Sequence, residues 1–174
     1  MNIKHIVAIF GAVAVAVGLV AGVAQAGGGG GGVFGLIINE LMVIPATGEK
    51  EWVELWNKGT EDIDLAGWKL TELTSPQTAS STENTLLDLL GVIPAGGLMA
   101  FDVGTTKLNN AGDSVGLYNA NGIEVGRITY GTTTLFPSDV GAPSAGYSTA
   151  LKFVGWKAVV SPTKNLLNRG WWQE

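Results

Sequence analysis

The residues best suited by type to acid–base chemistry are three glutamates, Glu40, Glu51 and Glu54. A glycosidase-type reaction would need two carboxyl groups facing each other across the scissile bond. The side chains of Glu51 and Glu54 point to opposite faces of a regular strand, because an odd number of positions separates them. A catalytic pair would have to be assembled from different strands. We therefore interpret these carboxylates as solvated or hydrogen-bonded structural groups.

Nucleophilic and metal chemistry lack their usual side chains. The chain contains no Cys, and its single His is His5, in an N-terminal segment that we expect to be removed. Ser–His and Cys–His pairs and the common zinc sites need imidazole or thiolate. Asp62 and Asp64 offer oxygen ligands on one face, but they lack the third ligand and the glycine of an EF-hand loop, which favours turn solvation over calcium binding. We predict that the protein is not an enzyme and has no cofactor or metal.

Two tryptophans and a glutamate are the candidate binding residues. Residues 52–56 alternate between two faces, which is typical of a half-buried strand. If Val53 and Leu55 face the core, then Trp52, Glu54 and Trp56 stand on the opposite face. Clustered exposed aromatic side chains mark contact surfaces, so we predict that these three residues bind a protein or a glycan. The alternative is that a loop or the C-terminal tail covers them.

A second tryptophan pair, Trp171 and Trp172, stands near the end of the chain. It either attaches the tail to the folded domain, over Trp52 and Trp56, or projects towards a partner or lipid headgroups. The pattern of residues does not choose between these two interpretations.

Residues 49–73 contain the clearest structural pattern in the chain. An alternating run is followed by turn residues, a short second apolar run, a glycine and a third alternating run. Asn57, Gly59 and Gly67 are expected to shape the turns. The apolar residues predicted for the core are Val53, Leu55, Ile63, Leu65, Trp68 and Leu70.

Short strands recur at regular intervals in the remainder. They are predicted at residues 36–44, 98–103, 114–118 and 123–130, with an edge strand at 147–154. Residues 85–92 fit either a short helix or a strand. Residues 119–122, Asn-Ala-Asn-Gly, form a strong hairpin signal. Strands of this length, separated by Gly, Asn and Pro turns, predict an all-β fold, an antiparallel β-sandwich.

The N-terminal segment predicts export. Residues 6–23 are apolar, Lys4 precedes them, and Ala24-Gln25-Ala26 has the small residues that a signal peptidase requires. The apolar run exceeds the roughly 7–15 residues of a usual signal peptide, so an uncleaved membrane anchor is the alternative. We assign residues 1–26 to a hydrophobic signal helix, 27–34 to a glycine-rich tether and 35–174 to the sandwich domain. The expected location is secreted or in the cell envelope.

The charge of the chain does not favour nucleic acid as a partner. The formal charge is −5, and loss of Lys4 with the leader makes it −6. Electrostatic binding to nucleic acid draws its affinity from basic residues that neutralise phosphates. The basic residues here are scattered along the chain, and membrane contact is expected only through residues 1–26, if they are retained.

Several short motifs occur together in a specific order. They are Trp52-Val53-Glu54-Leu55 with Asn57 and Gly59, Ile63-Asp64-Leu65, Gly67-Trp68 with Leu70, Ile93-Pro94-Ala95-Gly96, Leu108-Asn109, Gly112-Asp113-Ser114-Val115, Tyr130-Gly131 and the tail 161–168. With these motifs in this order, the chain resembles the lamin tail domain family. The resemblance implies an immunoglobulin-like β-sandwich. It also implies a protein- and DNA-interaction module, as in nuclear lamins, or an exported domain, as in prokaryotic members.

Three functions remain open on these observations. The first is a non-catalytic exported module that binds proteins or surface polymers. The second is a self-assembling filament or coat subunit, in which the glycine run and residues 33–38 supply an intermolecular strand. The third is an accessory domain of a secreted hydrolase.

Overall fold

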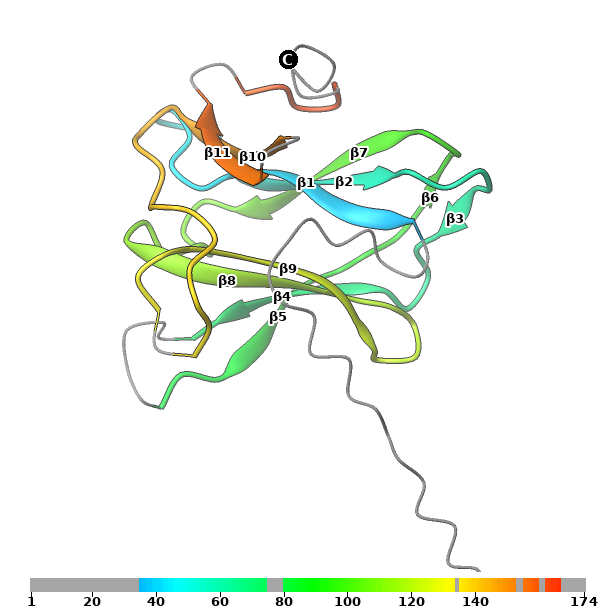
Figure 1. Cartoon of the computed structure of the whole chain (residues 1–174), viewed down its shortest axis with the longest axis horizontal. Coiled ribbons are helices and arrows are strands. Elements are labelled where there is room, and N and C mark those ends of the chain that lie inside the picture. Colours follow the sequence, from blue (N-terminus) through cyan, green and yellow to red (C-terminus); the bar gives the residue numbers. More distant parts are fainter. Residues whose placement is uncertain (1–34, 75–79, 134, 153–154, 160–161, 167–174) are drawn as a thin grey trace, which may run out of the picture.

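The computed structural model describes residues 35–74, 80–133, 135–152, 155–159 and 162–166 (Figure 1). The predicted signal helix at 1–26, the tether at 27–34 and the Trp171–Trp172 pair lie outside these ranges. No helix long and apolar enough to cross a membrane occurs in the part of the chain that is described. The strands are β1 (Leu36–Met42), β2 (Glu51–Asn57), β3 (Ile63–Asp64), β4 (Lys69–Leu73), β5 (Glu83–Asp88), β6 (Val92–Ile93), β7 (Leu98–Gly104), β8 (Gly112–Tyr118), β9 (Glu124–Gly131), β10 (Ser148–Lys152) and β11 (Gly155–Val159).

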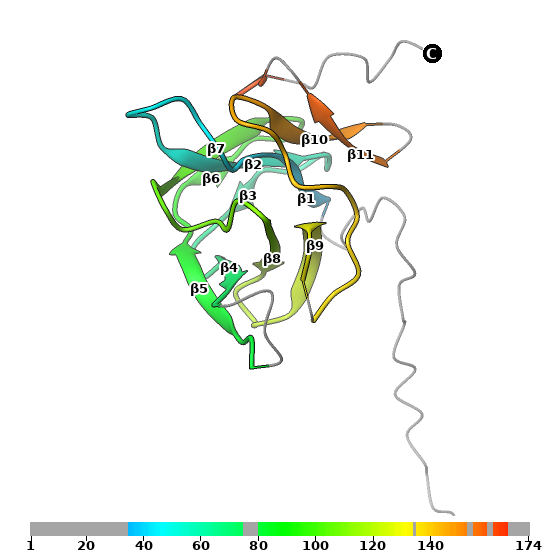
Figure 2. The same ribbon diagram turned by 90° about the vertical axis from the view of Figure 1, so that its left-hand side faces the viewer.

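The strands form two main layers, and the predicted antiparallel sandwich is confirmed. One layer has the strand order β11-β10-β1-β2-β7 and the other has β5-β4-β8-β9, while β3 and β6 form a small separate ribbon. Every pair of neighbouring strands in these sheets is antiparallel. Figures 1 and 2 show the two layers one above the other, with the ribbon of β3 and β6 at one end.

The core lies between the layers, as the period-two pattern predicted. Of the six residues predicted for the core, five are buried there and Ile63 is partly buried against it. The five-stranded sheet contributes inward-facing side chains from alternate positions of β1 and β2, and the four-stranded sheet does the same from β4, β8 and β9. Core residues on these strands include Leu36, Ile38, Leu41, Leu55, Leu70, Leu117, Ile128 and Tyr130.

A β-bulge in β1 controls which side chains reach each face. Ile38 pairs with Leu55 and Glu40 pairs with Glu54, so Asn39 is an extra residue on β1. An extra residue shifts the alternation by one position. Leu41 therefore returns to the core, and Asn39 and Glu40 both direct their side chains to the side of the sheet that faces away from it.

Residues 85–92, which fit a helix or a strand, belong to β5 and β6 and contain the turn between them. Residues 147–154 were expected to form an edge strand; the strand is confirmed as β10, but its edge position is wrong. β10 lies inside the five-stranded sheet, between β1 and the unpredicted β11. Edge position depends on the strands that pair on each side, and alternation within one strand carries no information about them.

The first part of β1 also affects the filament hypothesis. Leu36, Ile37 and Ile38 pair with β2 in the chain's own sheet, and Leu36 and Ile38 belong to its core. These three residues are therefore not available as a separate donor strand. The rest of the proposed donor, residues 33–34 and the glycine run, lies outside the described residues.

Candidate functional site

The side of β1, β2 and β7 that is turned away from the core, here called the outer face, carries all three predicted binding residues. Register places its side chains in three rows that run across the strands. One row is apolar, one is polar and one is mixed. The rows are Ile37–Trp56–Leu98, Glu40–Glu54–Ala100 and Met42–Trp52–Asp102.

The polar row contains two carboxylates that lie opposite each other and are fully buried, Glu40 and Glu54. Glu40 accepts hydrogen bonds from the hydroxyl of Ser148 and from Thr163, whose Oγ1 lies 2.5 Å from Glu40 Oε2. Glu54 accepts one from Asn39 Nδ2 at 2.6 Å. Buried charges need such partners, because water no longer solvates them.

Residues 162–166, here called the strap, cover these carboxylates. Thr163 N donates to Glu40 Oε1 at 3.1 Å, and Asn165 N donates to Glu54 Oε2. The side-chain oxygen of Asn165 accepts from Ala100 N at 2.8 Å, at the edge of the sheet. The strap therefore crosses β1, β2 and β7 in turn, and Figure 1 shows it beyond the five-stranded sheet, on the side away from the other layer.

The local conformation of the strap explains how two of its backbone amides reach the sheet. Leu166 N donates to Thr163 O at 2.6 Å, which closes a tight turn. Asn165 has a φ of 59° within this turn. Asparagine tolerates this left-handed region better than most residues do. The Nζ atom of Lys164, the residue between Thr163 and Asn165, lies 2.6 Å from Asp102 Oδ1.

The three predicted binding residues differ in exposure. Trp52 is 5 % exposed and Glu54 is 0 % exposed, whereas Trp56 is only partly buried. Lys164 Nζ lies 5.6 Å from the centre of the Trp52 ring. The alternative in which the C-terminal tail covers these residues thus describes Trp52 and Glu54. A binding role of Trp56 stays a prediction.

The environment of Glu54 changes its acidity. Burial raises the pKa of Glu54 to about 7, and the nearby Glu40 adds to this, while the hydrogen bonds from Asn39 and Asn165 oppose it. The protonated form is therefore a substantial part of the population near neutral pH. This makes Glu54 a group whose charge can change within the physiological range.

Glu51, the third candidate carboxylate, points away from Glu54, as the spacing predicted. Its Oε2 accepts from the backbone amides of Lys107 and Leu108 at 2.7 and 3.0 Å. Asp113 accepts from the next amide, that of Asn109, at 3.0 Å. Burial raises the pKa of Asp113, and these hydrogen bonds oppose the rise. The two carboxylates therefore hold the loop between β7 and β8.

The two aspartates considered as calcium ligands also accept hydrogen bonds from backbone amides. Asp62 Oδ1 accepts from Ala95 N and Asp64 Oδ1 accepts from Ala66 N, each at 3.0 Å. A search of the described residues found no group of three His, Cys, Asp or Glu side chains that could hold a metal ion.

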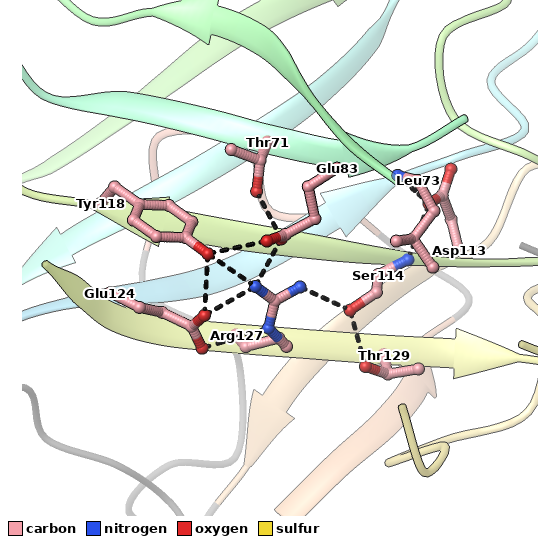
Figure 3. A network of polar contacts seen from close by, with 9 residues as sticks. All are labelled: Thr71, Leu73, Glu83, Asp113, Ser114, Tyr118, Glu124, Arg127 and Thr129. Atoms are coloured by element: carbon pink, nitrogen blue, oxygen red, sulfur yellow. Dashed lines mark hydrogen bonds and ion pairs between the residues drawn. The ribbon is translucent and has the colours of Figure 1, made fainter. Parts of the chain in front are cut away.

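A polar cluster that the sequence analysis did not predict lies on the four-stranded sheet (Figure 3). At its centre, Arg127 Nη2 lies 2.5 Å from Glu83 Oε1 and 2.6 Å from Glu124 Oε2. Tyr118 OH donates to both glutamates, at 2.8 and 3.0 Å. The guanidinium carbon lies 4.0 Å from the centre of the Phe136 ring. The partners come from three strands and a loop. The spacing of residues along the sequence therefore could not predict the cluster.

Burial, ion pairs and hydrogen bonds within this cluster shift the pKa values of Glu83 and Tyr118. Burial raises the pKa of Glu83, but hydrogen bonds from Arg127 and Tyr118 outweigh burial and leave that pKa below its usual value. Burial and the hydrogen bonds to Glu83 and Glu124 raise the pKa of Tyr118. One guanidinium thus serves two carboxylates, and the direct effect of the cluster is to join β5, β8 and β9.

Asn57 links two of the short motifs. Its Nδ2 lies 2.7 Å from Glu61 O, 3.1 Å from Ile93 O and 3.1 Å from Pro94 O. Its Oδ1 accepts from Gly59 N at 2.9 Å. This buried amide therefore joins the turn after β2 to the turn after β6.

Comparison with known proteins places this geometry in a wider context. A family model described as Lamin Tail Domain matches residues 34–132, which is more than half of the 174 residues. The matched residues include β1 to β9. They contain the predicted binding residues of β2 and the residues of the Arg127 cluster that lie on β5, β8 and β9. β10, β11 and the strap follow it. No curated protein matches the chain.

Proposed function

Because the chain belongs to the lamin tail domain family, a family of immunoglobulin-like domains, we propose that it is a non-catalytic module that binds proteins or surface polymers outside the cytoplasm. The fold does not identify the partner, since one fold serves many functions. The argument for binding therefore depends on the surface that the chain presents.

The observation that carries the proposal is the position of Trp56 on the outer face. The contacts of the strap described above involve the polar and mixed rows, while Trp56 and Leu98, in the apolar row, are partly exposed. Trp56 Nε1 donates to Gly96 O at 3.2 Å, and Lys58 Nζ lies 5.2 Å from the centre of the ring. A tryptophan whose ring is already oriented loses little entropy on contact, and tryptophan is enriched among the residues that dominate binding energy.

The proposed location outside the cytoplasm depends on the N-terminal residues. A positive charge, an apolar run and the small residues Ala24 and Ala26 are the features of an export signal. The acidic charge of the remaining chain agrees with a protein or polymer partner and disfavours nucleic acid.

Trp56→Ala tests the binding proposal. The probes are immobilised peptidoglycan, surface polysaccharides and cell-surface proteins, with retention measured by surface plasmon resonance. We expect the wild type to bind at least one probe and Trp56→Ala to bind it at least about tenfold more weakly, the loss expected of a residue that dominates an interface. Thermal unfolding should show that the variant remains folded.

Two variants serve as controls for that experiment. Leu90→Ala removes an apolar side chain that is 75 % exposed at another place and should leave binding unchanged. Trp52→Ala removes a buried ring and should lower the free energy of unfolding more than it weakens binding. Equal binding by Trp56→Ala and the wild type, or no retention of any probe by the wild type, would contradict the proposal.

A further inference from the structure

The strap is held to the outer face by polar contacts from a very short stretch of chain. Thr163 supplies a backbone amide and a hydroxyl to Glu40, and Asn165 supplies a backbone amide to Glu54. Leu166, the apolar residue of the strap, is 64 % exposed and does not anchor it in the core. Segments with few buried apolar contacts open locally without unfolding the rest of the protein.

Opening of the strap would leave a surface with a specific chemical requirement. Glu40 and Glu54 lie opposite each other, and like charges in that position repel. Both would lose hydrogen-bond donors, while Asp102 would lose its ion pair with Lys164. The surface then fits a peptide turn that offers two backbone amides, a hydroxyl and an ammonium group.

The strap of a second copy offers all of these groups. Every contact described between the strap and the outer face is made by atoms of residues 163–165 of the strap, and none depends on which molecule the strap is attached to. Exchange of an identical element between copies preserves its contacts and is a common route to association. We propose that the outer face of one copy accepts the strap of another, so that the chain associates by strap exchange.

The protein concentration decides whether a strap binds the outer face of its own copy or that of another copy. A strap attached to its own domain competes at an effective concentration on the order of millimolar, as short linkers do. At lower protein concentrations each copy keeps its own strap. Exchange becomes detectable at high protein concentration, or when one copy's strap and the other copy's face are altered.

The charged groups around Glu54 give the exchange a pH dependence. Glu40 faces it from β1, Asp102 lies on the neighbouring β7, and Lys164 on the strap; Lys157 of β11 lies in the same cross-strand row as Glu54. Burial holds the pKa of Glu54 at about 7. Above that pH the ionised carboxylate disfavours the buried position, so straps open more often and exchange is faster at about pH 8 than at about pH 6.

Two complementary variants of the full chain test the proposal. Thr163→Pro with Asn165→Pro removes both backbone N–H donors of the strap and leaves the outer face intact. Glu40→Leu with Glu54→Leu removes the acceptor oxygens of the outer face and leaves the strap intact. We expect each variant alone to be monomeric by native mass spectrometry and analytical ultracentrifugation, because each lacks one half of the contact. An equimolar mixture should form a heterodimer.

The mixture provides the decisive result. If it contains only monomers, while circular dichroism shows both variants folded, the proposal is overturned. Association of either variant alone to the same extent as the mixture would overturn it equally, because the contact would not need both strap and face.

A second pair covers the case in which the leucine variant does not fold. Asp102→Lys and Lys164→Glu change partly exposed side chains, and each repels the strap within its own chain. Mixed, they restore one attractive pair between copies, so a heterodimer is expected from the mixture only. Lys157→Glu is the matched control, since it reverses an exposed lysine outside the strap and should not replace Lys164→Glu. Failure of the Asp102→Lys and Lys164→Glu mixture to associate would overturn the proposal.

Discussion

At the scale of single residues, the carboxylates singled out for chemistry act as acceptors for the chain's own groups. Glu51 binds two amides of the loop after β7, Glu40 binds Thr163, and Glu54 binds the amide of Asn165. A buried carboxylate without a partner is very costly, so the sequence did imply that such groups are paired. The partners lie far along the chain, and their identity required the structure.

Glu54 predicts a measurable effect of pH on stability. Its pKa is raised to about 7 in the folded protein, above the usual value of a glutamate. A raised pKa contributes stability that is complete at low pH and is lost as pH rises through the folded value. We expect the wild type to lose free energy of unfolding, relative to Glu54→Gln, between about pH 5 and about pH 8. Urea unfolding across this range measures the difference.

The control for this measurement is Glu49→Gln, at an exposed glutamate in the turn before β2. Its difference from the wild type should stay constant across the same range. A constant difference for Glu54→Gln as well would show that burial does not raise the pKa of Glu54.

At the scale of elements, alternation located the strands well wherever one face is buried. Residues 52–56 were predicted and β2 is Glu51–Asn57; the predicted turn at 119–122 joins β8 to β9. The missing element is β11, in which the side chain of Trp156 packs against the core. The formation of this strand depends on pairing with β10, which the residues of β11 by themselves do not reveal.

Gly116 shows how the Arg127 cluster depends on the shape of β8. A Cβ atom at this position would lie 2.5 Å from Thr71 Oγ1 and 2.9 Å from Arg127 Nη2. We expect Gly116→Ala to displace the guanidinium and to lower the free energy of unfolding by about 1–3 kcal/mol, as overpacking does. Chemical denaturation provides the measurement.

Gly126→Ala, in the neighbouring strand β9, is the matched control. No atom lies within 4 Å of the Cβ that it would add, so it should be neutral or slightly stabilising. If both substitutions had the same small effect, the close approach at Gly116 would not be needed for stability.

At the scale of the whole molecule, the residues that match the family model do not include all strands of the five-stranded sheet. The family match ends at residue 132, but β10 pairs with β1, and Glu40 of β1 takes hydrogen bonds from Ser148 and Thr163. The segment after the match therefore completes the five-stranded sheet and covers its outer face. In this protein, residues beyond the family match therefore bury the two carboxylates of the outer face.

The proposed location gives a prediction for the whole chain. Expressed with a functional export pathway, the protein should be cleaved after Ala26, because the small residues at 24 and 26 suit a signal peptidase. Intact-mass analysis should find a product that begins at Gly27. Ala24→Arg with Ala26→Arg should prevent cleavage. A mature protein that keeps residues 1–26 would instead support the membrane-anchor alternative.

The sequence alone determined the fold class, most strands of the sandwich and most of the core, because burial of one sheet face imposes a period of two on neighbouring residues. It also determined that Glu51 and Glu54 point to opposite faces. Only the tertiary structure decided that the strap covers Trp52 and Glu54 while Trp56 stays partly exposed. Such contacts join residues roughly 110 positions apart, and no local period records which distant segment will lie on the outer face of a sheet.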